Sequence, residues 1–287
     1  MPRGSCGFGI VRSIDVTRGR TRLAELCEIL SREMGTLFIP HHPESYGGLI
    51  EAFESGVVSV AWLPPLACIR LEDARKATVL ALPVRRGAVS YRAALITHAT
   101  QANAPRSVSD LAGKRVAWVD RESSSGYYVP RLFLQSAGVL LSGFAEERFV
   151  GSHANVVAAV TGGRVDVGAT YCALGAAAGE SGSFAPAVPD GQPPPPLPRG
   201  PWTTEGASPP PLRLLATTGA IPNDALVVSS SLPADLRLSL LRWVLNLGAG
   251  RAQQLCAELF GADAFQVSSP AHFDPLRRLV SVARSRG

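Results

Sequence analysis

The stretch VDRESSSGYYVP, residues 119–130, stands between an apolar run and an amphipathic segment. The run GKRVAW at 113–118 predicts a buried strand, and RLFLQSAG at 131–138 predicts a helix that ends at a glycine. The first N–H groups of a helix lack internal partners and carry the positive end of its dipole. A strand-to-helix junction of this kind therefore favours the binding of an anion.

Three serines and a glycine give this junction groups that suit an oxyanion. The hydroxyls of Ser123, Ser124 and Ser125 can donate hydrogen bonds, and Gly126 lets the backbone approach where a Cβ would obstruct it. Pro130 fits the first helical turn, where its missing N–H costs nothing. The alternative interpretation is a solvated loop in which one serine is the helix N-cap.

Composition places the chain among globular proteins. Its 287 residues are 46% hydrophobic and 18% charged, which allows a sizeable core in one large or two moderate domains. The net charge, 28 − 23 = +5, is small and the arginines form no basic stripe, so we expect no nucleic-acid partner. The sequence shows no apolar run of transmembrane length and no apolar region typical of a signal peptide. We therefore expect either a cytoplasmic protein or a chain that lacks its leader.

The cysteines and histidines predict neither a disulfide framework nor a metal site. The five cysteines are an odd number, form no CxxC pair and lie in or beside apolar segments, so we expect buried free thiols. They are Cys6, Cys27, Cys68, Cys172 and Cys256. His41 and His42 are adjacent and cannot both face one site from a strand. We expect no metal and no cofactor.

Predicted strands and helices alternate along the chain, which favours an α/β fold. The chain leaves a first lobe near Thr97 and returns near Thr218, which predicts a two-lobed type II periplasmic-binding-protein fold that closes by hinge motion. Each lobe is expected to be a mostly parallel sheet flanked by helices, with a ligand cleft between the lobes. Lobe one then comprises residues 1–97 and 219–287, and lobe two residues 98–218.

A proline-rich segment, residues 186–211, interrupts lobe two. The consecutive prolines at 193–196 exclude helix and central strand, and they predict a surface loop of polyproline-II type. A ligand for an SH3-type domain is the alternative interpretation.

Two segments of the chain are related by a constant offset. Residues 51–62, EAFESGVVSVAW, align with 158–169, AAVTGGRVDVGA, and both predict a helix, a glycine stop and a buried strand. The same offset, 153 − 46 = 107, places Tyr46 on His153. Any two αβ units share such a pattern, which is the alternative interpretation. Loops at the carboxyl ends of parallel strands line the ligand crevice, so we expect Tyr46 and His153 to face each other across the cleft.

Five short motifs, taken together and in order, resemble a known family. They are YGGLIEA at 46–52, VAWL at 60–63, SSSG at 123–126, GSHANVV at 151–157 and IPND at 221–224. They are similar to the phosphonate-binding family, the substrate-binding components of phosphate, phosphite and phosphonate ABC importers. The resemblance spans residues 8–260 apart from the proline-rich segment. It implies a periplasmic, or membrane-associated and extracytoplasmic, binding protein.

The site that the resemblance implies combines hydroxyls, an imidazole and a carboxylate. Its members are Tyr46, Tyr91, Ser123, Ser124, Ser125, Gly126, His153 and Asp224. The serines hold the oxyanion, both tyrosines come from lobe one, and the histidine comes from lobe two. The resemblance implies that Asp224 can pair with the amino group of aminoalkyl phosphonates, as the matching acidic residue does in some members of the family. Trp62 and Tyr171 are expected at the cleft wall.

Several of these residues also have a structural interpretation. His153 suits a helix-capping surface position, and Tyr91 suits an ordinary strand face. Asp224 suits a turn after Pro222, and Trp62 suits the core. If Asp224 does face the ligand, it disfavours a fully ionised phosphate, because two anions repel in a closed cleft.

The residues favour binding over catalysis. The sequence contains no GxSxG or HExxH motif and no pair of carboxylates around His153, so we expect no catalytic residue. The leading hypothesis is a monomeric binding protein for a small phosphorus oxyanion, with an ABC permease as its partner if the chain is exported. The alternatives are a cytoplasmic ligand-sensing protein of the same fold, an enzyme on that fold, and an interaction module suggested by the proline-rich segment.

Overall fold

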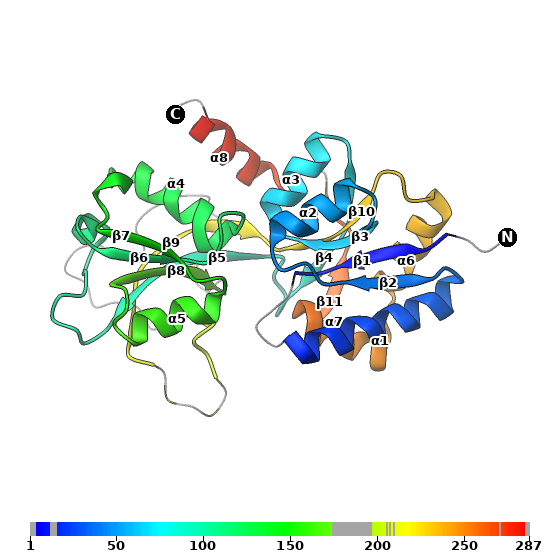
Figure 1. Ribbon diagram of the computed structural model, residues 1–287, viewed down its shortest axis with the longest axis horizontal. Helices are drawn as coiled ribbons and strands as arrows, with labels where there is room; N and C mark the ends of the chain where they lie inside the picture. Colours follow the sequence, from blue (N-terminus) through cyan, green and yellow to red (C-terminus); the bar gives the residue numbers. More distant parts are fainter. Residues whose placement is uncertain are drawn as a thin grey trace. The chain divides into compact units, whose positions relative to one another are not determined.

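The computed structural model describes residues 4–11, 16–173, 197–204, 206, 208, 210–269 and 271–284. The chain divides into two compact units (Figure 1). Unit 1 comprises Met1–Val89 and Pro222–Asp274, and unit 2 comprises Ser90–Ile221 and Pro275–Gly287. Most of the predicted proline-rich loop, including 186–196, lies outside the described residues.

Unit 1 is built on a six-stranded sheet with the order β11-β4-β10-β3-β1-β2. Its strands are β1 (Cys6–Gly9), β2 (Phe38–His41), β3 (Val60–Leu63), β4 (Ala77–Val84), β10 (Ala225–Ser229) and β11 (Ala264–Gln266). Strand β1 pairs in parallel with β2 and β3, whereas β10 runs antiparallel to β3 and β4, and β11 runs antiparallel to β4. Its helices are α1 (Val16–Met34), α2 (Tyr46–Glu54), α3 (Pro65–Asp73), α6 (Ala234–Leu245) and α7 (Arg251–Phe260).

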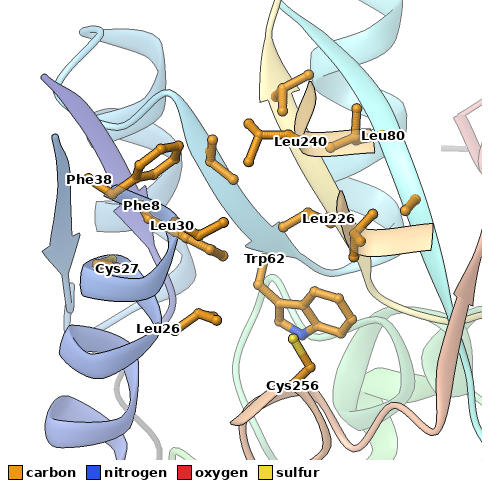
Figure 2. Packing of buried hydrophobic residues seen from close by; sticks show 14 of the residues in the cluster. Phe8, Leu26, Cys27, Leu30, Phe38, Trp62, Leu80, Leu226, Leu240 and Cys256 are labelled. Atoms are coloured by element: carbon orange, nitrogen blue, oxygen red, sulfur yellow. The ribbon is translucent and has the colours of Figure 1, made fainter. Parts of the chain in front are cut away.

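Helix α1 of unit 1 packs its apolar face on the sheet. Leu23, Leu26 and Leu30 recur at helical spacing, and all three side chains are buried. Figure 2 shows Leu26 and Leu30 in the same core as Phe8 of β1 and Trp62 of β3. Burying a leucine side chain contributes roughly 1.5–3 kcal/mol, so this face accounts for the docking of α1.

Unit 2 is built on a five-stranded sheet with the order β7-β6-β8-β5-β9. Its strands are β5 (Ser90–His98), β6 (Arg115–Trp118), β7 (Glu146–Phe149), β8 (Val167–Cys172) and β9 (Leu212–Pro222). Strand β6 pairs in parallel with β7 and β8, and β5 runs antiparallel to β8. Its helical elements are η1 (Val108–Leu111), η2 (Ser124–Tyr128), α4 (Val129–Ser136), η3 (Leu141–Gly143) and α5 (His153–Thr161). The last helix, α8 (Asp274–Arg284), groups with unit 2 from Pro275 onward.

Both faces of the unit 2 sheet are covered. Residues alternate between the faces, so Ile96 of β5 belongs to the core under α5, while its neighbour Leu95 belongs to the core under α4. Val156 and Phe133 are the matching buried residues of α5 and α4. Figure 1 shows α4 and α5 on opposite faces of this sheet.

The structure confirms an α/β fold with flanking helices, but both sheets are mixed rather than mostly parallel. Strand β5 aligns Arg92 with Cys172 of β8, so it belongs to unit 2 and not to lobe one as expected from the sequence. The chain accordingly changes units at 89/90 and 221/222, where the sequence suggested 97/98 and 218/219. The last helix, expected in lobe one, groups with unit 2.

Two further expectations are tested by the fold. All five cysteines are buried free thiols, as expected. Burial raises the pKa of Cys27 and Cys172 to about 12, so both thiols stay protonated and unreactive at neutral pH. Within the described ranges, every helix is too short or too polar to span a bilayer.

Candidate functional site

The serine-rich junction of unit 2 contains a single π-helical turn, η2, between β6 and α4. Ser123 is the N-cap of this turn, because its Oγ accepts a hydrogen bond from the Gly126 N–H at 3.0 Å. Its carbonyl oxygen accepts from the Tyr128 N–H, also at 3.0 Å. Pro130 falls in the first turn of α4, where it was expected. Ser123 thus performs the capping role that the alternative interpretation gave to one of the serines.

Ser124 differs from its neighbour because its hydroxyl is buried without a partner. Ser124 and Ser125 are each 2% exposed, and η2 packs on strands β5 and β8 of the same unit. Among the described residues, no group hydrogen-bonds the Ser124 Oγ. A buried polar atom without a partner costs about 1–3 kcal/mol, and such atoms are rare in folded proteins. A bound anion would give this hydroxyl an acceptor.

Gly126 is required by packing inside the junction. A Cβ at this position would lie 2.4 Å from Val119 Cγ2 and 2.8 Å from the Ser123 Oγ. The Gly126 carbonyl also accepts a hydrogen bond from the Val119 N–H at 3.0 Å, which holds the turn against the end of β6. The glycine therefore fixes the shape of the loop, a reason that differs from the ligand approach expected from the sequence.

His153 begins helix α5, whose N-cap is Ser152; the Ser152 Oγ accepts from the Asn155 N–H at 3.1 Å. The ring is half-buried, and its Nδ1 lies 2.9 Å from Oγ1 of Thr170 on β8. Burial lowers the pKa of His153 to about 4, because desolvation disfavours the charged imidazolium. His153 is therefore neutral near pH 7.

Two tyrosines of unit 2 form successive ring contacts that begin at His153. The ring of Tyr171 meets His153 edge-on with centroids 4.9 Å apart, and it meets Tyr91 edge-on at 6.3 Å. Tyr171 is 39% exposed, so it is a surface residue of unit 2, and its place in the cleft wall stays a prediction. Tyr91 begins β5 and so belongs to unit 2, which corrects its expected place in lobe one. The serine turn packs on the same two strands that carry the tyrosines.

Unit 1 carries the remaining expected residues. Tyr46 is the first residue of α2, whose N-cap Ser45 accepts from the Gly48 N–H at 3.1 Å. Tyr46 and His153 therefore occupy equivalent helix starts, as the repeat predicts. Trp62 is 9% exposed and its ring stacks on Phe260 at a centroid distance of 4.5 Å, so it is a core residue.

The Trp62 indole also lies beside the carboxyl group of Asp224 and lowers the pKa of that group. Burial is the larger effect and raises the pKa of Asp224, while the charge of Arg85 and the neighbouring Trp62 indole oppose that rise. The carboxyl group of Asp224 is thus desolvated, and Arg85 and Trp62 offset only part of the resulting rise in its pKa. Such a group favours a proton or a cation near it.

Sequence reasoning missed two residues of these clusters. Arg85 lies with its Cζ 5.9 Å from the centre of the Trp62 ring and donates to the Phe260 carbonyl from Nε and Nη2 at 3.2 and 2.8 Å. No motif marks it, because its partners lie far away in the sequence. Thr170 ends a predicted strand, and that position at the carboxyl end of β8 was the available signal.

Comparison with known proteins shows that the chain matches the model of a known family. Residues 8–273 match the model of a family described as ABC transporter, phosphonate, periplasmic substrate-binding protein. A curated relative, the phosphate-import protein PhnD of Mycolicibacterium smegmatis, is 27% identical over 156 residues. That alignment covers 51% of this chain and 48% of the relative, so the chain spans about half the length of the curated relative it matches.

Solved structures share the fold at low identity. A binding-protein component of an ABC phosphonate transporter from Pseudomonas aeruginosa is 20% identical, with a TM-score of 0.72 over 96% of this chain and 85% of that one. PhnD1 of Prochlorococcus marinus, solved with methylphosphonate, is 15% identical with a TM-score of 0.72 over 98% of both chains. A Xanthomonas citri protein solved with chloride is 21% identical with a TM-score of 0.74, also over 98% of both. These likenesses establish the two-lobed periplasmic-binding-protein fold.

Proposed function

Since this chain belongs to the family of periplasmic substrate-binding proteins of phosphonate ABC transporters, we propose that it binds a small phosphorus oxyanion without catalysis. The ligand is a phosphonate, phosphite or phosphate. The observation that carries the proposal is the buried Ser124 hydroxyl, which no described group hydrogen-bonds, in a turn that packs on strand β8, the strand of Thr170 and Tyr171.

The groups of unit 2 suit an oxyanion without an arginine fork. Ser124 and Ser125 supply hydroxyls beside the helix start of η2 and α4, and His153 is neutral because burial lowers its pKa. Neutral donors bind the oxygen atoms of such a ligand by hydrogen bonds, but they do not neutralise the ligand's negative charge. Tyr91 and Tyr171 border these groups.

The two units have complementary roles in this proposal. In unit 1, Tyr46 and Asp224 are the residues proposed to contact the ligand, and the Trp62 indole lies beside the Asp224 carboxyl group. An ABC permease is the partner of the ligand-loaded protein, which acts as a monomer outside the cytoplasm.

The arrangement of the serines supports binding rather than catalysis. A nucleophilic serine needs a base within hydrogen-bond reach. The Ser123 Oγ accepts the capping bond from Gly126, and His153 Nδ1 pairs with Thr170. In the described part of the chain, no hydrogen bond joins His153 to any of the three serines.

Thermal-shift assays and calorimetry with phosphate, phosphite, methylphosphonate and 2-aminoethylphosphonate test the proposal, with sulfate as the control anion. A ligand present at 100 times its Kd adds about 2.7 kcal/mol to the free energy of unfolding. We expect a stabilising shift and a calorimetric isotherm with at least one of the four phosphorus compounds. No response to any of them contradicts the proposed function.

A further inference from the structure

Thr170 has a more specific relationship to His153 than a core threonine requires. Its side chain is fully buried on the central strand β8, and its Oγ1 lies 2.9 Å from His153 Nδ1. In the part of the chain that the structure describes, the Thr170 hydroxyl has no other hydrogen-bond partner. The direction of this hydrogen bond therefore decides which ring nitrogen of His153 carries the proton.

Only one direction of this hydrogen bond satisfies the hydroxyl. A neutral imidazole carries one N–H, and its other nitrogen is an acceptor. If Nδ1–H donated to Thr170, the hydroxyl proton would be buried without an acceptor, which is the costlier arrangement. If the Thr170 hydroxyl donates to Nδ1, both groups are satisfied and the ring proton lies on Nε2.

The ring is also fixed in orientation. Tyr171 meets it edge-on, with the two ring planes at 84°. Among the described residues, no protein group hydrogen-bonds Nε2 of His153. The ring therefore has one satisfied nitrogen and one donor that remains available to a ligand.

We propose that Thr170 is a positioning residue that holds His153 in the Nε2–H tautomer, so that the neutral ring donates to an oxygen of the bound oxyanion. The inference rests on the proposed function and adds a specificity to it. A fixed N–H donor can hydrogen-bond only a ligand oxygen that acts as an acceptor at that position. It therefore disfavours a ligand whose P–OH group must itself donate there. The low pKa of His153 agrees with a neutral donor.

The tautomer is measured on the ligand-free protein by ¹⁵N NMR with ¹⁵N-labelled histidine, and the His153 signals are assigned with His153→Gln. Binding of phosphate and methylphosphonate is measured separately by calorimetry. The variants are Thr170→Val, which removes the hydroxyl, and Thr170→Ser, which keeps it. Thr97→Val is the matched control, because Thr97 is also fully buried on a strand of this sheet and makes one hydrogen bond, to the Asp166 carbonyl at 2.9 Å.

We expect a protonated Nε2 and an unprotonated Nδ1 in the wild type and in Thr170→Ser. In Thr170→Val this preference is lost and the affinity for the anion falls about five- to tenfold, the effect of one hydrogen bond. Thr170→Ser and Thr97→Val keep wild-type affinity. An Nδ1–H tautomer in a wild-type protein that binds the anion overturns this inference alone, as does an equal loss of affinity in Thr170→Val and Thr97→Val. A wild-type protein that binds no phosphorus oxyanion overturns the proposed function, and the role of Thr170 with it.

Discussion

The Trp62 indole lies beside the carboxyl group of Asp224 and lowers the pKa of that group, while its ring stacks on Phe260 at a centroid distance of 4.5 Å. One side chain thus contacts both the core of unit 1 and a partly buried carboxyl group. Amphipathic aromatic residues suit this position, because the ring packs in the core and the N–H reaches a polar partner. The consequence is a carboxyl group whose position is set by the core.

The first prediction concerns the ionisation of Asp224. Burial raises its pKa in the folded protein, so the native state favours the protonated form more than the unfolded state does. The contribution of this group to the free energy of unfolding is complete below the ordinary aspartate pKa of about 3.9. It is lost as the pH rises through the raised pKa of the folded protein. We therefore expect Asp224→Asn to gain stability relative to the wild type as the pH is raised from about 3.9 to neutrality, in urea unfolding at a series of pH values. The exposed Asp263, whose carboxylate accepts from the Arg86 N–H, supplies the control Asp263→Asn. A parallel pH profile for wild type and Asp224→Asn contradicts the assignment.

The same variant tests the selectivity assigned to Asp224. If Asp224 belongs to the ligand site as proposed, replacing its carboxylate reduces the repulsion of a doubly charged phosphate and removes the partner of an ammonium group. We expect Asp224→Asn to bind phosphate more tightly and 2-aminoethylphosphonate more weakly, each by about tenfold, as judged by calorimetry. If both affinities shift in the same direction, Asp224 does not select by charge.

A third prediction follows from the packing of Gly126. A Cβ there would lie 2.4 Å from Val119, so Gly126→Ala is expected to cost about 1–3 kcal/mol of stability through overpacking. Gly143 is the matched control, because a Cβ at Gly143 meets nothing within 4 Å and this residue lies in the same unit. Chemical denaturation of both alanine variants measures the difference. Equal stabilities would show that the junction tolerates a side chain and that the loop shape does not depend on the glycine.

The order of elements could be predicted because local signals agreed with the final fold. Ser45 and Ser152 cap the helices that begin at Tyr46 and His153, and both caps are visible as a serine before an apolar helical segment. The spacing of Leu23, Leu26 and Leu30 likewise identified the buried face of α1. These signals lie within a few residues of the structure that they specify.

The pairing of strands could not be predicted in the same way. An apolar run such as Ala93–Ile96 is compatible with either sheet, and only its long-range pairing with β8 assigns it to unit 2. Tyr91 was placed in the wrong lobe for the same reason. Arg85 and Thr170 were missed because their partners, Phe260 and His153, lie 175 and 17 residues away in the sequence. The serine-rich turn could be located between a strand and a helix from the sequence, but the different environments of its serines depend on burial and hydrogen bonds that no motif encodes.

A fourth prediction concerns His153 and acid stability. Its pKa is lowered to about 4 in the folded protein, so the stability that the neutral ring contributes is present above the unfolded value of about 6.5 and is lost as the pH falls towards 4. We expect His153→Gln to remove on the order of 2 kcal/mol of the stability loss in that range, less than the full shift implies because the ring is only half-buried. Burial also lowers the pKa of His272, so part of the wild-type dependence remains in the variant. Identical pH profiles for the two proteins contradict a buried, neutral His153.

The fifth prediction is that Ser123 contributes to stability, whereas the adjacent Ser124 contributes to ligand binding. The Ser123 Oγ caps the turn through Gly126, so Ser123→Ala is expected to lower the free energy of unfolding by about 1 kcal/mol. No described group hydrogen-bonds the Ser124 Oγ in its buried position, so Ser124→Ala is expected to leave stability unchanged or to raise it slightly. Urea unfolding of both variants measures this contrast. A larger loss of stability in Ser124→Ala than in Ser123→Ala contradicts the roles assigned here.

Calorimetric titration of the wild type and Ser124→Ala with methylphosphonate and phosphate tests the central claim most directly. The account predicts saturable binding of at least one of these ligands by the wild type, and a loss of about tenfold or more in Ser124→Ala at unchanged stability, because this hydroxyl has its acceptor only in the bound state. Equal affinities in the two proteins, or no binding of either ligand to the wild type, would contradict it.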